Sequence, residues 1–498
     1  MRIRESLLDE LDLPGAVSAE VERGILEIPE QALDLSLANS EVQQRVAALV
    51  AASLLDGTDD QPADHIESSK PGGGFRTLEL LPFASRVLYR ALAEWALSRQ
   101  PALKRTYERW IQMKDGPLEL DSTRYVVTAD IASFYQYVDH DLLRTELVSQ
   151  MGGATVAATL GEFLHGVMGR RFGLPQLSMA SDVFSELVID IMERRLLRKG
   201  VAIWRYNDDF RLAAASWREA QEGLAELVRE ARAIGLTLND SKTFTRARDT
   251  YERWIGSSDR TWNAIEGAVN FDFQQARLEL YSDDLPELTA ADLSLEASDR
   301  ALDLWADPVA RDQLAQEGSI HVLRELLAIS LVLMGAEHDT RALRVCRQAL
   351  ATERSVTEEI ASYLTQVILI DQTLEELQEW LVDEELFLTP WQELWILTPL
   401  LAAPTLTKEL REWVASRTAD SLPGIVRARA ALVLARHQAV DASLVASLVE
   451  EVHPASNSDA VAALALICSD SDPILRAEIR ENPLHRMIVE GTRSRSWT

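Results

Sequence analysis

Residues 202–214 constrain the fold more than any other stretch of this chain. Two short apolar runs meet there at the sequence Tyr-Asn-Asp-Asp of residues 206–209. Asn and Asp favour tight turns, and apolar runs on both sides are typical of strands, so the segment predicts a β-hairpin with Asp208 and Asp209 at its tip. Adjacent carboxylates repel each other, and a divalent cation relieves that repulsion. An exposed turn without any further role is the alternative for this segment taken alone.

A third acidic residue ends another predicted strand. Residues 125–130 form a β-branched run that closes on Asp130, and Ile131 and the aromatic Tyr135 follow it. An Asp at the end of a buried strand is costly unless it caps a helix, pairs with a cation or binds metal. The nearby Asp139 has a simpler interpretation, as the N-cap of a helix that runs through Met151.

The order of the predicted elements brings these acids together. The strand with Asp130 is followed by a helix, a turn and a second helix over residues 182–197, the acidic hairpin, a helix over residues 217–234, and a strand that carries Lys242. This order predicts a split βαβ sheet with helices on one face and with Asp130 and Asp208 on neighbouring central strands. Two carboxylates at adjacent strand ends are what two-metal phosphoryl transfer requires. For Lys242 the alternative is a solvated lysine at the end of a strand.

A glycine-rich turn with a cation on each side precedes the sheet, at Lys70 to Arg76. Glycines let the backbone approach a phosphate closely, and the two cations would neutralise it. The turn lacks the Gly-Lys-Ser/Thr ending of a P-loop, so an ordinary nucleoside triphosphatase is not expected. A flexible basic hairpin is the alternative.

Composition limits the class of protein. A chain of 498 residues holds two or three domains, and its two cysteines argue against a disulfide framework and fit a reducing cytoplasm. The formal charge of -29 speaks against nucleic-acid binding, but bases outnumber acids between Glu79 and Arg124, which predicts a local basic surface. No stretch is apolar enough for a signal peptide or a membrane span, so a soluble protein without membrane partners is expected.

The C-terminal part is helix after helix from about Asp284 onward. Helix pairs recur at roughly 40 residues, which is typical of a HEAT-like solenoid. Four tryptophans are expected to be packing residues rather than base-stacking platforms because large aromatic side chains are usually buried: Trp380, Trp391, Trp395 and Trp413.

Five sequence blocks, in order, resemble the motifs of reverse transcriptases across roughly residues 65 to 250. The glycine turn is similar to the fingers segment, residues 130–135 to the first catalytic motif, and residues 173–176 to the second. Tyr206 to Asp209 resembles the Tyr-x-Asp-Asp box, and residues 235–242 the fourth motif.

The resemblance implies a role for each matched residue. Asp130 and Asp208 would be the main ligands of two Mg²⁺ ions, or of Mn²⁺, with the Ile131 carbonyl assisting and Asp209 nearby. Lys242 would neutralise or protonate the leaving pyrophosphate. The nucleotide would be held by five residues: Lys70 and Arg76 at the triphosphate, Tyr135 at the 2′ position of the sugar, and Gln176 and Tyr206 beside the incoming nucleotide or the template.

One residue departs from the family pattern. Most reverse transcriptases have Gly after the Pro-Gln pair of the second motif, whereas this chain has Leu177. A branched side chain narrows the space beside template and nucleotide, which argues against ordinary template reading more than against metal chemistry.

The architecture resembles a narrower group, the abortive-infection (Abi) reverse transcriptases of bacterial antiphage defence. In that group a helical domain replaces the thumb, assemblies are oligomeric, and DNA can be made without a template from a protein hydroxyl. A Tyr would then be the primer, and Tyr251 and Tyr281, which follow the predicted palm, are the candidates. The DNA product would be attached covalently to the protein.

The sequence therefore predicts an α+β N-terminal half, with reverse-transcriptase fingers and a ferredoxin-like palm, followed by an all-α HEAT-like repeat domain. The expected boundaries are 1–60 for an N-terminal helical segment, 61–255 for fingers and palm, 256–284 for a connector and 285–498 for the repeats. The leading function is dNTP polymerisation in a bacterial cytoplasm. The alternatives are a templated reverse transcriptase that copies a dedicated non-coding RNA or a retroelement, and an inactive scaffold whose working part is the helical domain.

Overall fold

A computed structural model describes residues 2–23, 27–37, 40–57, 62–269, 295–316, 320–383 and 385–495. These residues form two compact units. The first contains residues 1–26, 38–64 and 79–256, and the second contains residues 27–37, 65–78 and 257–498. The second unit thus includes two N-terminal segments that the sequence assigns to other domains.

The first unit begins with helices, as expected for residues 1 to 60. They are α1 (Glu5–Leu8), α2 (Leu13–Arg23) and α4 (Ser40–Asp56), and α5 (Phe83–Arg99) packs against both α2 and α4. The short η1 (Pro101–Leu103) leads into α6 (Tyr107–Glu119).

A four-stranded sheet forms the centre of this unit. Its strands are β3 (Tyr125–Asp130), β4 (Ala202–Tyr206), β5 (Asp209–Ala214) and β6 (Phe244–Ala247), in the order β4-β5-β3-β6, and all neighbours are antiparallel. β3 and β5 are the central pair, as the sequence predicts. Residues 236–239 form no extended strand beyond one isolated bridge, so Lys242 lies on a short turn, η3 (Asp240–Lys242), before β6.

Helices pack on both faces of this sheet. α10 (Trp217–Ala233) packs on β5 and β3, and its Gly223 lies against Leu212. α6 lies on the opposite face, where Gly116 packs so closely on Trp204 that an added Cβ would clash with the indole ring. The expectation of helices on one face only is therefore wrong: the missing side chain of Gly116 lets a second layer approach.

Two of the remaining helices of the first unit were expected, α7 (His140–Met151), after the short η2 (Phe134–Tyr137), and α9 (Met179–Arg198). Two were not, α8 (Ala154–Met168) and α11 (Arg248–Ile255). The predicted N-cap of α7 is confirmed, since the Asp139 carboxylate accepts a hydrogen bond from the Leu142 amide at 2.7 Å. α9 packs on α5, α7 and β4, and it carries several site residues.

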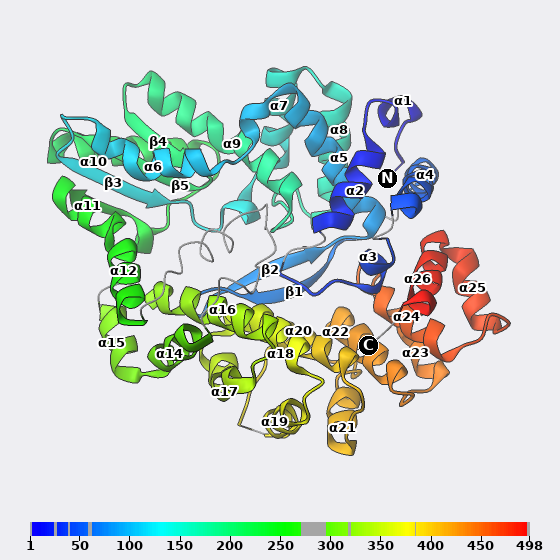
Figure 1. Cartoon of the computed structure of the whole chain (residues 1–498). Helices are drawn as coiled ribbons and strands as arrows, with labels where there is room; N and C mark the ends of the chain where they lie inside the picture. Colours follow the sequence, from blue (N-terminus) through cyan, green and yellow to red (C-terminus); the bar gives the residue numbers. More distant parts are fainter. Residues whose placement is uncertain are drawn as a thin grey trace. The chain divides into compact units, whose positions relative to one another are not determined.

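The second unit is mostly helical (Figure 1). It contains α3 (Ala32–Ser36), the hairpin of β1 (Asp64–Ser69) and β2 (Phe75–Leu80), and, in chain order, α12 (Ser257–Val269), α14 (Leu295–Ala306), α15 (Pro308–Gln316), α16 (Ile320–Ala336), η5 (Thr340–Ala342), α17 (Leu343–Thr352), η6 (Arg354–Val356), α18 (Thr357–Val367), α19 (Asp371–Val382), α20 (Pro390–Ala402), α21 (Lys408–Ser416), α22 (Gly424–Arg436), α23 (Ala442–Glu451), α24 (Ser458–Ile467), α25 (Pro473–Glu481) and α26 (Pro483–Ser494).

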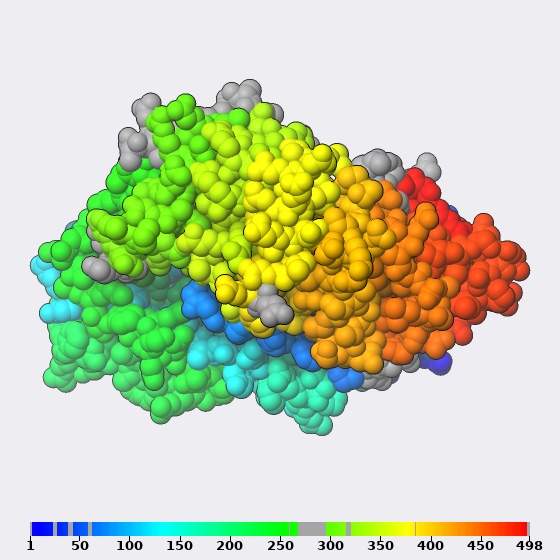
Figure 2. Space-filling model, turned by 90° about the horizontal axis from the view of Figure 1, so that it is seen from below, coloured from blue at the N-terminus to red at the C-terminus, as the bar shows by residue number. Residues whose placement is uncertain are grey.

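Alternate helices of this series pack against one another. The packed sequence runs α14, α16, α18, α20, α22, α24 and α26, with the other helices on the outside. The surface of this unit accordingly follows the chain order, from green through yellow and orange to red in Figure 2. Such stacking of helix pairs is typical of repeat architectures. The four tryptophans named above are buried here, each less than 10% exposed, so their expected packing role is confirmed.

Within the described residues, no helix combines the length and the apolar character needed to cross a membrane.

Candidate active site

The acidic hairpin forms as the sequence predicts. β4 and β5 pair with Tyr206 opposite Asp209, and Asn207 and Asp208 form the two-residue turn between them. Asn207 adopts a positive φ of 52°, a conformation that Asn accepts more readily than most residues and that tight hairpin turns require. Local turn chemistry thus places one acid in the turn and the next at the start of a strand.

The third acid lies directly beside this turn. Asp130, the last residue of β3, is paired with Asp209 across the sheet. The amide of Ile131 donates a hydrogen bond to the carbonyl of Asp208 at 3.2 Å, which fixes the turn against the end of β3. Asp130 is only 7% exposed. The structure therefore brings the three predicted acids together at one end of the sheet.

The proximity of these acids changes their acidity. Burial, followed by repulsion from Asp130 and Asp209, raises the pKa of Asp208 to about 6. Burial also raises the pKa of Asp209, although Arg211, at 3.5 Å, opposes that rise. Negative charge is thus concentrated at the turn beyond what the protein itself neutralises, and this favours a bound cation.

Lys242 and Asn239 neutralise part of this charge. The Nζ of Lys242 lies 3.0 Å from a carboxylate oxygen of Asp130, and the Asn239 side-chain amide donates to the other oxygen at 3.3 Å. Burial lowers the pKa of Lys242, but its hydrogen bond and attraction to Asp130 give a net rise. Lys242 is therefore a protonated partner of the acids. Sequence reasoning overlooked Asn239, although its place in the fourth motif block was a usable signal.

Hard oxygen donors in a repelling pair fit Mg²⁺ or Mn²⁺. Within the described ranges, no three Asp, Glu, His or Cys side chains converge as a ready metal cluster. Asp130 lies beside Lys242 and Asp209 lies beside Arg211, so each of these two carboxylates has a cation partner. Asp130 and Asp208, with the adjacent Ile131 carbonyl and with Asp209 nearby, remain the predicted residues that would hold the ion.

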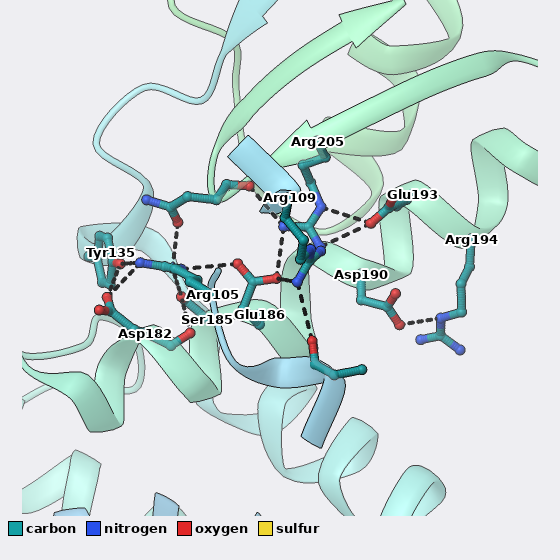
Figure 3. A network of polar contacts seen from close by, with 12 residues as sticks. Arg105, Arg109, Tyr135, Asp182, Ser185, Glu186, Asp190, Glu193, Arg194 and Arg205 are labelled. Atoms are coloured by element: carbon teal, nitrogen blue, oxygen red, sulfur yellow. Dashed lines mark hydrogen bonds and ion pairs between the residues drawn. The ribbon is translucent and has the colours of Figure 1, made fainter. Parts of the chain in front are cut away.

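Tyr135, the predicted residue at the sugar, is held by its hydroxyl group (Figure 3). The hydroxyl accepts a hydrogen bond from Arg105 at 2.7 Å and donates one to Asp182 on α9. Burial, and then the nearby Asp182, raise its pKa. The ring is therefore fixed in one orientation beside the hairpin turn.

Arg105 is the centre of a polar network that the sequence did not reveal (Figure 3). Its guanidinium contacts Tyr135 and Asp182, and it donates to Ser185 at 2.8 Å, to Glu186 at 3.1 Å and to the side chain of Asn207 in the turn at 2.6 Å. Arg105 thus links the first motif, α9 and the hairpin turn. The only signal in the sequence was the spacing of Asp182 and Glu186, which places them one helical turn apart on one face.

A second arginine supports the same turn from the sheet. The side chain of Arg205 on β4 is 1% exposed and lies 3.0 Å from the carboxylates of both Glu186 and Glu193 on α9. It also donates to the backbone carbonyl of Asn207 at 3.0 Å. The turn is consequently anchored through both its side chain and its backbone.

Some of the bases between Glu79 and Arg124 lie inside the fold, whereas Arg99, Lys104 and Arg124 are exposed. Arg86 and Arg90 are less than 10% exposed and face Glu20, with Arg90 at 2.5 Å. Arg105 and Arg109 are paired with Glu186. Some of the charges that look like a patch along the sequence are used for internal ion pairs, because buried arginines need carboxylate partners.

The second motif has an unusual backbone. The amide of Gln176 donates to the carboxylate of Glu79 at 3.0 Å, and Leu177 adopts a φ of 55°. Left-handed geometry costs an L-residue roughly 1–2 kcal/mol, whereas glycine adopts it freely. The backbone at residue 177 thus has a conformation typical of glycine, although the side chain is that of leucine.

We expect Leu177→Gly to be more stable than Leu177→Ala by about 1 kcal/mol, because glycine alone relieves the left-handed strain. Urea denaturation of both variants measures the difference. At Glu222, in the middle of α10, the same pair of substitutions should give the opposite order, since glycine costs about 1 kcal/mol in a helix. An alanine variant at 177 as stable as the glycine variant would refute the strain argument.

The predicted triphosphate residues lie on the β1–β2 hairpin, in the second unit. The guanidinium of Arg76 is 2.5 Å from the Glu27 carboxylate, which also accepts a hydrogen bond from Ser68 at 2.6 Å. Arg76 therefore has an ion-pair partner within its own unit, and its role at the triphosphate stays a prediction. Lys70 is exposed at the glycine turn.

The priming candidates have different outcomes. Tyr251 has no exposed surface, and its hydroxyl donates to the carbonyl of Lys114 at 2.7 Å. The hydroxyl of Tyr251 is therefore not accessible in this structure, and its priming role stays a prediction. Tyr281 lies outside the described residues.

Comparison with known proteins identifies the central part of the chain. Residues 68–258 match the sequence model of a family described as reverse transcriptase (RNA-dependent DNA polymerase). This segment is a reverse-transcriptase domain, which makes the chain an enzyme of the nucleotidyltransferase class. Comparison with curated protein sequences gives no match.

Two solved structures are similar to this chain. The telomerase from Candida albicans, in complex with a TWJ fragment of telomeric RNA, has 8% identity and a TM-score of 0.28; the match covers 65% of this chain and 62% of that one. The telomerase from Candida tropicalis, with the same type of RNA fragment, has 12% identity and a TM-score of 0.31, over 76% of this chain and 68% of that one. Both likenesses are too loose to support a function.

Proposed function

We propose that this chain is a metal-dependent DNA polymerase of the reverse-transcriptase class that acts in antiphage defence. One observation carries the catalytic part of the proposal. Asp130 lies opposite Asp209, with Asp208 in the adjoining turn, where burial and then the other two acids raise the pKa of Asp208. Such a concentration of carboxylates inside a reverse-transcriptase domain is suited to nucleotidyl transfer.

The proposed reaction is the attack of a hydroxyl oxygen on the α-phosphorus of a dNTP. A bond forms between that oxygen and phosphorus, the bond to the bridging oxygen of pyrophosphate breaks, and the hydroxyl proton is lost. Asp130 and Asp208 would hold two Mg²⁺ ions, or Mn²⁺, which when bound activate the hydroxyl and stabilise the leaving pyrophosphate. Lys242, protonated beside Asp130, is placed to donate a proton or a positive charge to that pyrophosphate.

Tyr135 and Gln176 would shape the nucleotide site, with Tyr206 beside the turn. The hydroxyl of Tyr135 is held by Arg105 and Asp182, so the ring is a fixed wall suited to excluding a ribose 2′-hydroxyl. This favours dNTPs as substrates.

The defence role, protein priming and synthesis without a template are the finer part of the proposal. They are supported by the pairing of this domain with a stack of helices, and by the leucine side chain that Leu177 places where template access needs glycine. Tyr251 and Tyr281 are the proposed primers. Homo-oligomeric assembly and a bacterial cytoplasmic location belong to the same proposal.

Incubating the purified chain with each labelled dNTP and Mg²⁺ or Mn²⁺, with and without RNase, tests this function. We expect label that stays with the protein on a denaturing gel after RNase treatment. Loss of synthesis after RNase would favour a templated enzyme with a copurifying non-coding RNA. Absence of incorporation, combined with phage protection by an Asp208→Asn variant, would favour an inactive scaffold.

A further inference from the structure

Residues 27–37, which we call the strap, belong to the second unit, although the segments before and after them in the chain belong to the first. The strap consists of a short non-helical stretch followed by α3, and α3 packs on α24 and α26 (Figure 1). Its Ile28, Ala32 and Leu37 are each less than 10% exposed. A separate stretch of chain thus lies on the helical stack in the way that a bound peptide does.

Two tryptophans hold the start of the strap by its backbone. The indole nitrogens of Trp391 and Trp395, both on α20, donate hydrogen bonds to the carbonyl oxygen of Glu27, at 2.6 and 3.2 Å. One carbonyl can accept both because its oxygen has two lone pairs. The side chain of Glu27 is not used in these contacts and pairs with Arg76. A residue of another type at this position could therefore accept the same two hydrogen bonds.

A buried ion pair holds the middle of the strap. Arg429 on α22 and Asp459 on α24 lie 2.6 Å apart, and their side chains are 2% and 0% exposed. Arg429 also donates to the backbone carbonyl of Glu30 at 2.6 Å. Asp459 also accepts a hydrogen bond from the amide of Ala32 at 2.8 Å. Because a buried pair needs further hydrogen bonds for its remaining lone pairs and protons, a peptide backbone at this place is part of what the pair requires.

Gly491, in the interior of α26, makes room for the end of the strap. A Cβ added to Gly491 would lie 2.4 Å from the Oγ and 3.0 Å from the Cα of Ser36, closer than side chains pack. Glycine is unfavourable inside a helix, so the close approach of Ser36 gives it a role here. The helical surface is thus shaped for the strap from its first residues to its last turn.

The strap is held with local strain. Glu27 has a φ of 61°, in the left-handed region that is costly for a residue with a side chain. Gln31 is 4% exposed, and its Oε1 has no hydrogen-bond partner among the residues that the structure describes. Both costs disappear when the strap leaves the helices. The strap is therefore easier to displace than its contacts alone would indicate.

We propose that this face of α20, α22, α24 and α26 is a peptide-binding surface, and that the strap is a built-in ligand which a peptide segment of a partner protein displaces. The hydrogen bonds from Trp391, Trp395, Arg429 and Asp459 all go to backbone atoms of the strap, so a peptide of different sequence can make them. The partner segment has a small residue other than proline at the position of Ala32, because that position is buried and donates its amide. The surface consists of second-unit residues and does not depend on the proposed catalysis.

Ala32→Pro in the full chain tests this proposal. Proline has no amide N–H, so the hydrogen bond to Asp459 is lost. The backbone itself accepts proline, because residue 32 is the first of α3 and Gln31 before it is extended, with φ -86° and ψ 161°. We expect faster hydrogen exchange over residues 27–37, measured by mass spectrometry. A fluorescent peptide with the wild-type sequence of the strap should bind this variant about tenfold or more tightly than wild type, because its competitor within the chain is weakened.

The peptide and a second variant give further measurements. The same peptide with proline at the position of Ala32 should bind the variant chain about tenfold or more weakly than the wild-type peptide, since it cannot donate to Asp459. Gly491→Ala displaces the strap without touching it, because alanine favours the helix but its methyl group collides with Ser36. This variant should also exchange faster over the strap, and it should bind a peptide of residues 27–34, which ends before Ser36, more tightly than wild type does.

Glu5→Pro is the matched control. Glu5 is exposed and is also the first residue of a helix, α1, after the extended residue Arg4 with φ -79° and ψ 139°. It should change neither the exchange of the strap nor the binding of the peptides. Unchanged exchange in both Ala32→Pro and Gly491→Ala would show that these contacts do not hold the strap, and a released strap without peptide binding would show that the surface accepts no other ligand. Either result would overturn the proposal while leaving the polymerase assay unaffected.

Discussion

Asp208→Asn should reduce dNTP incorporation by about a thousandfold or more, which corresponds to roughly 4 kcal/mol of transition-state stabilisation. Asparagine keeps the size of the side chain but removes the negative charge that a divalent ion needs as a ligand. The turn itself should persist, because Asn207 supplies its positive φ and Ile131 binds the backbone carbonyl of residue 208 rather than its side chain. Single-nucleotide incorporation under saturating dNTP measures the loss.

Asp139→Asn is the matched control for this substitution. Asp139 is also an acid near the end of β3, but its carboxylate caps α7 and has no part in the acidic cluster. Asparagine caps helices about as well as aspartate, so activity should change less than twofold. Incorporation by Asp208→Asn at more than a tenth of the wild-type rate would exclude Asp208 as a metal ligand.

Stability gives a second and independent measurement for Asp208→Asn. The folded-state pKa of Asp208, about 6, lies above the ordinary value, so folding disfavours the ionised form. In EDTA the variant should therefore have a higher Tm than wild type at pH 8. That advantage should shrink as pH falls through about 6 and vanish below about 3, where the folded and unfolded carboxyl groups are both protonated.

Sequence patterns predicted those features of the site that depend on local chemistry. The turn residues, the strand that ends in Asp130 and the element order were enough to place Asp130 beside the acidic hairpin. The helices of the C-terminal part were predicted equally well: it was expected to be helix after helix, and α16 and α21 are examples of the helices found there. Both kinds of prediction rest on periodicity and turn preference, which act over a few residues.

The sequence did not predict the ion pairs between residues that are far apart in the chain. Arg105 and Arg90 looked like surface bases, because nothing near them in sequence reveals Glu186 or Glu20 as partners. Likewise nothing near Arg76 in the sequence reveals Glu27 as its ion-pair partner. Hydrophobic patterning determines which elements form, but it does not determine which carboxylate an arginine meets across the fold.

The largest stability effect is expected at Arg105. Its guanidinium contacts five groups from three segments, and its side chain is 15% exposed. Arg105→Met would leave Glu186, with a 2% exposed side chain, short of one cation, and would release the side chains of Tyr135 and Asn207. Breaking a buried pair in this way costs about 3–5 kcal/mol, and the lower end applies because Arg205 still contacts Glu186.

Arg109→Met separates this specific role from the loss of any arginine beside Glu186. Arg109 lies 3.4 Å from the same carboxylate, is 29% exposed and makes no contact with the hairpin turn in the described structure, so its loss should cost less than about 1 kcal/mol. Urea unfolding compares the two variants.

Because Arg105 also holds Asn207 next to Asp208, Arg105→Met should lower kcat about tenfold to a hundredfold even at a temperature where it is fully folded, as expected when a positioning contact is lost. The stability and the kcat of Arg105→Lys should lie between those of Arg105→Met and wild type, because one ammonium group cannot contact all the partners of the guanidinium. Equal stability of Arg105→Met and Arg109→Met would mean that the network of Figure 3 contributes no more than an ordinary partly exposed ion pair.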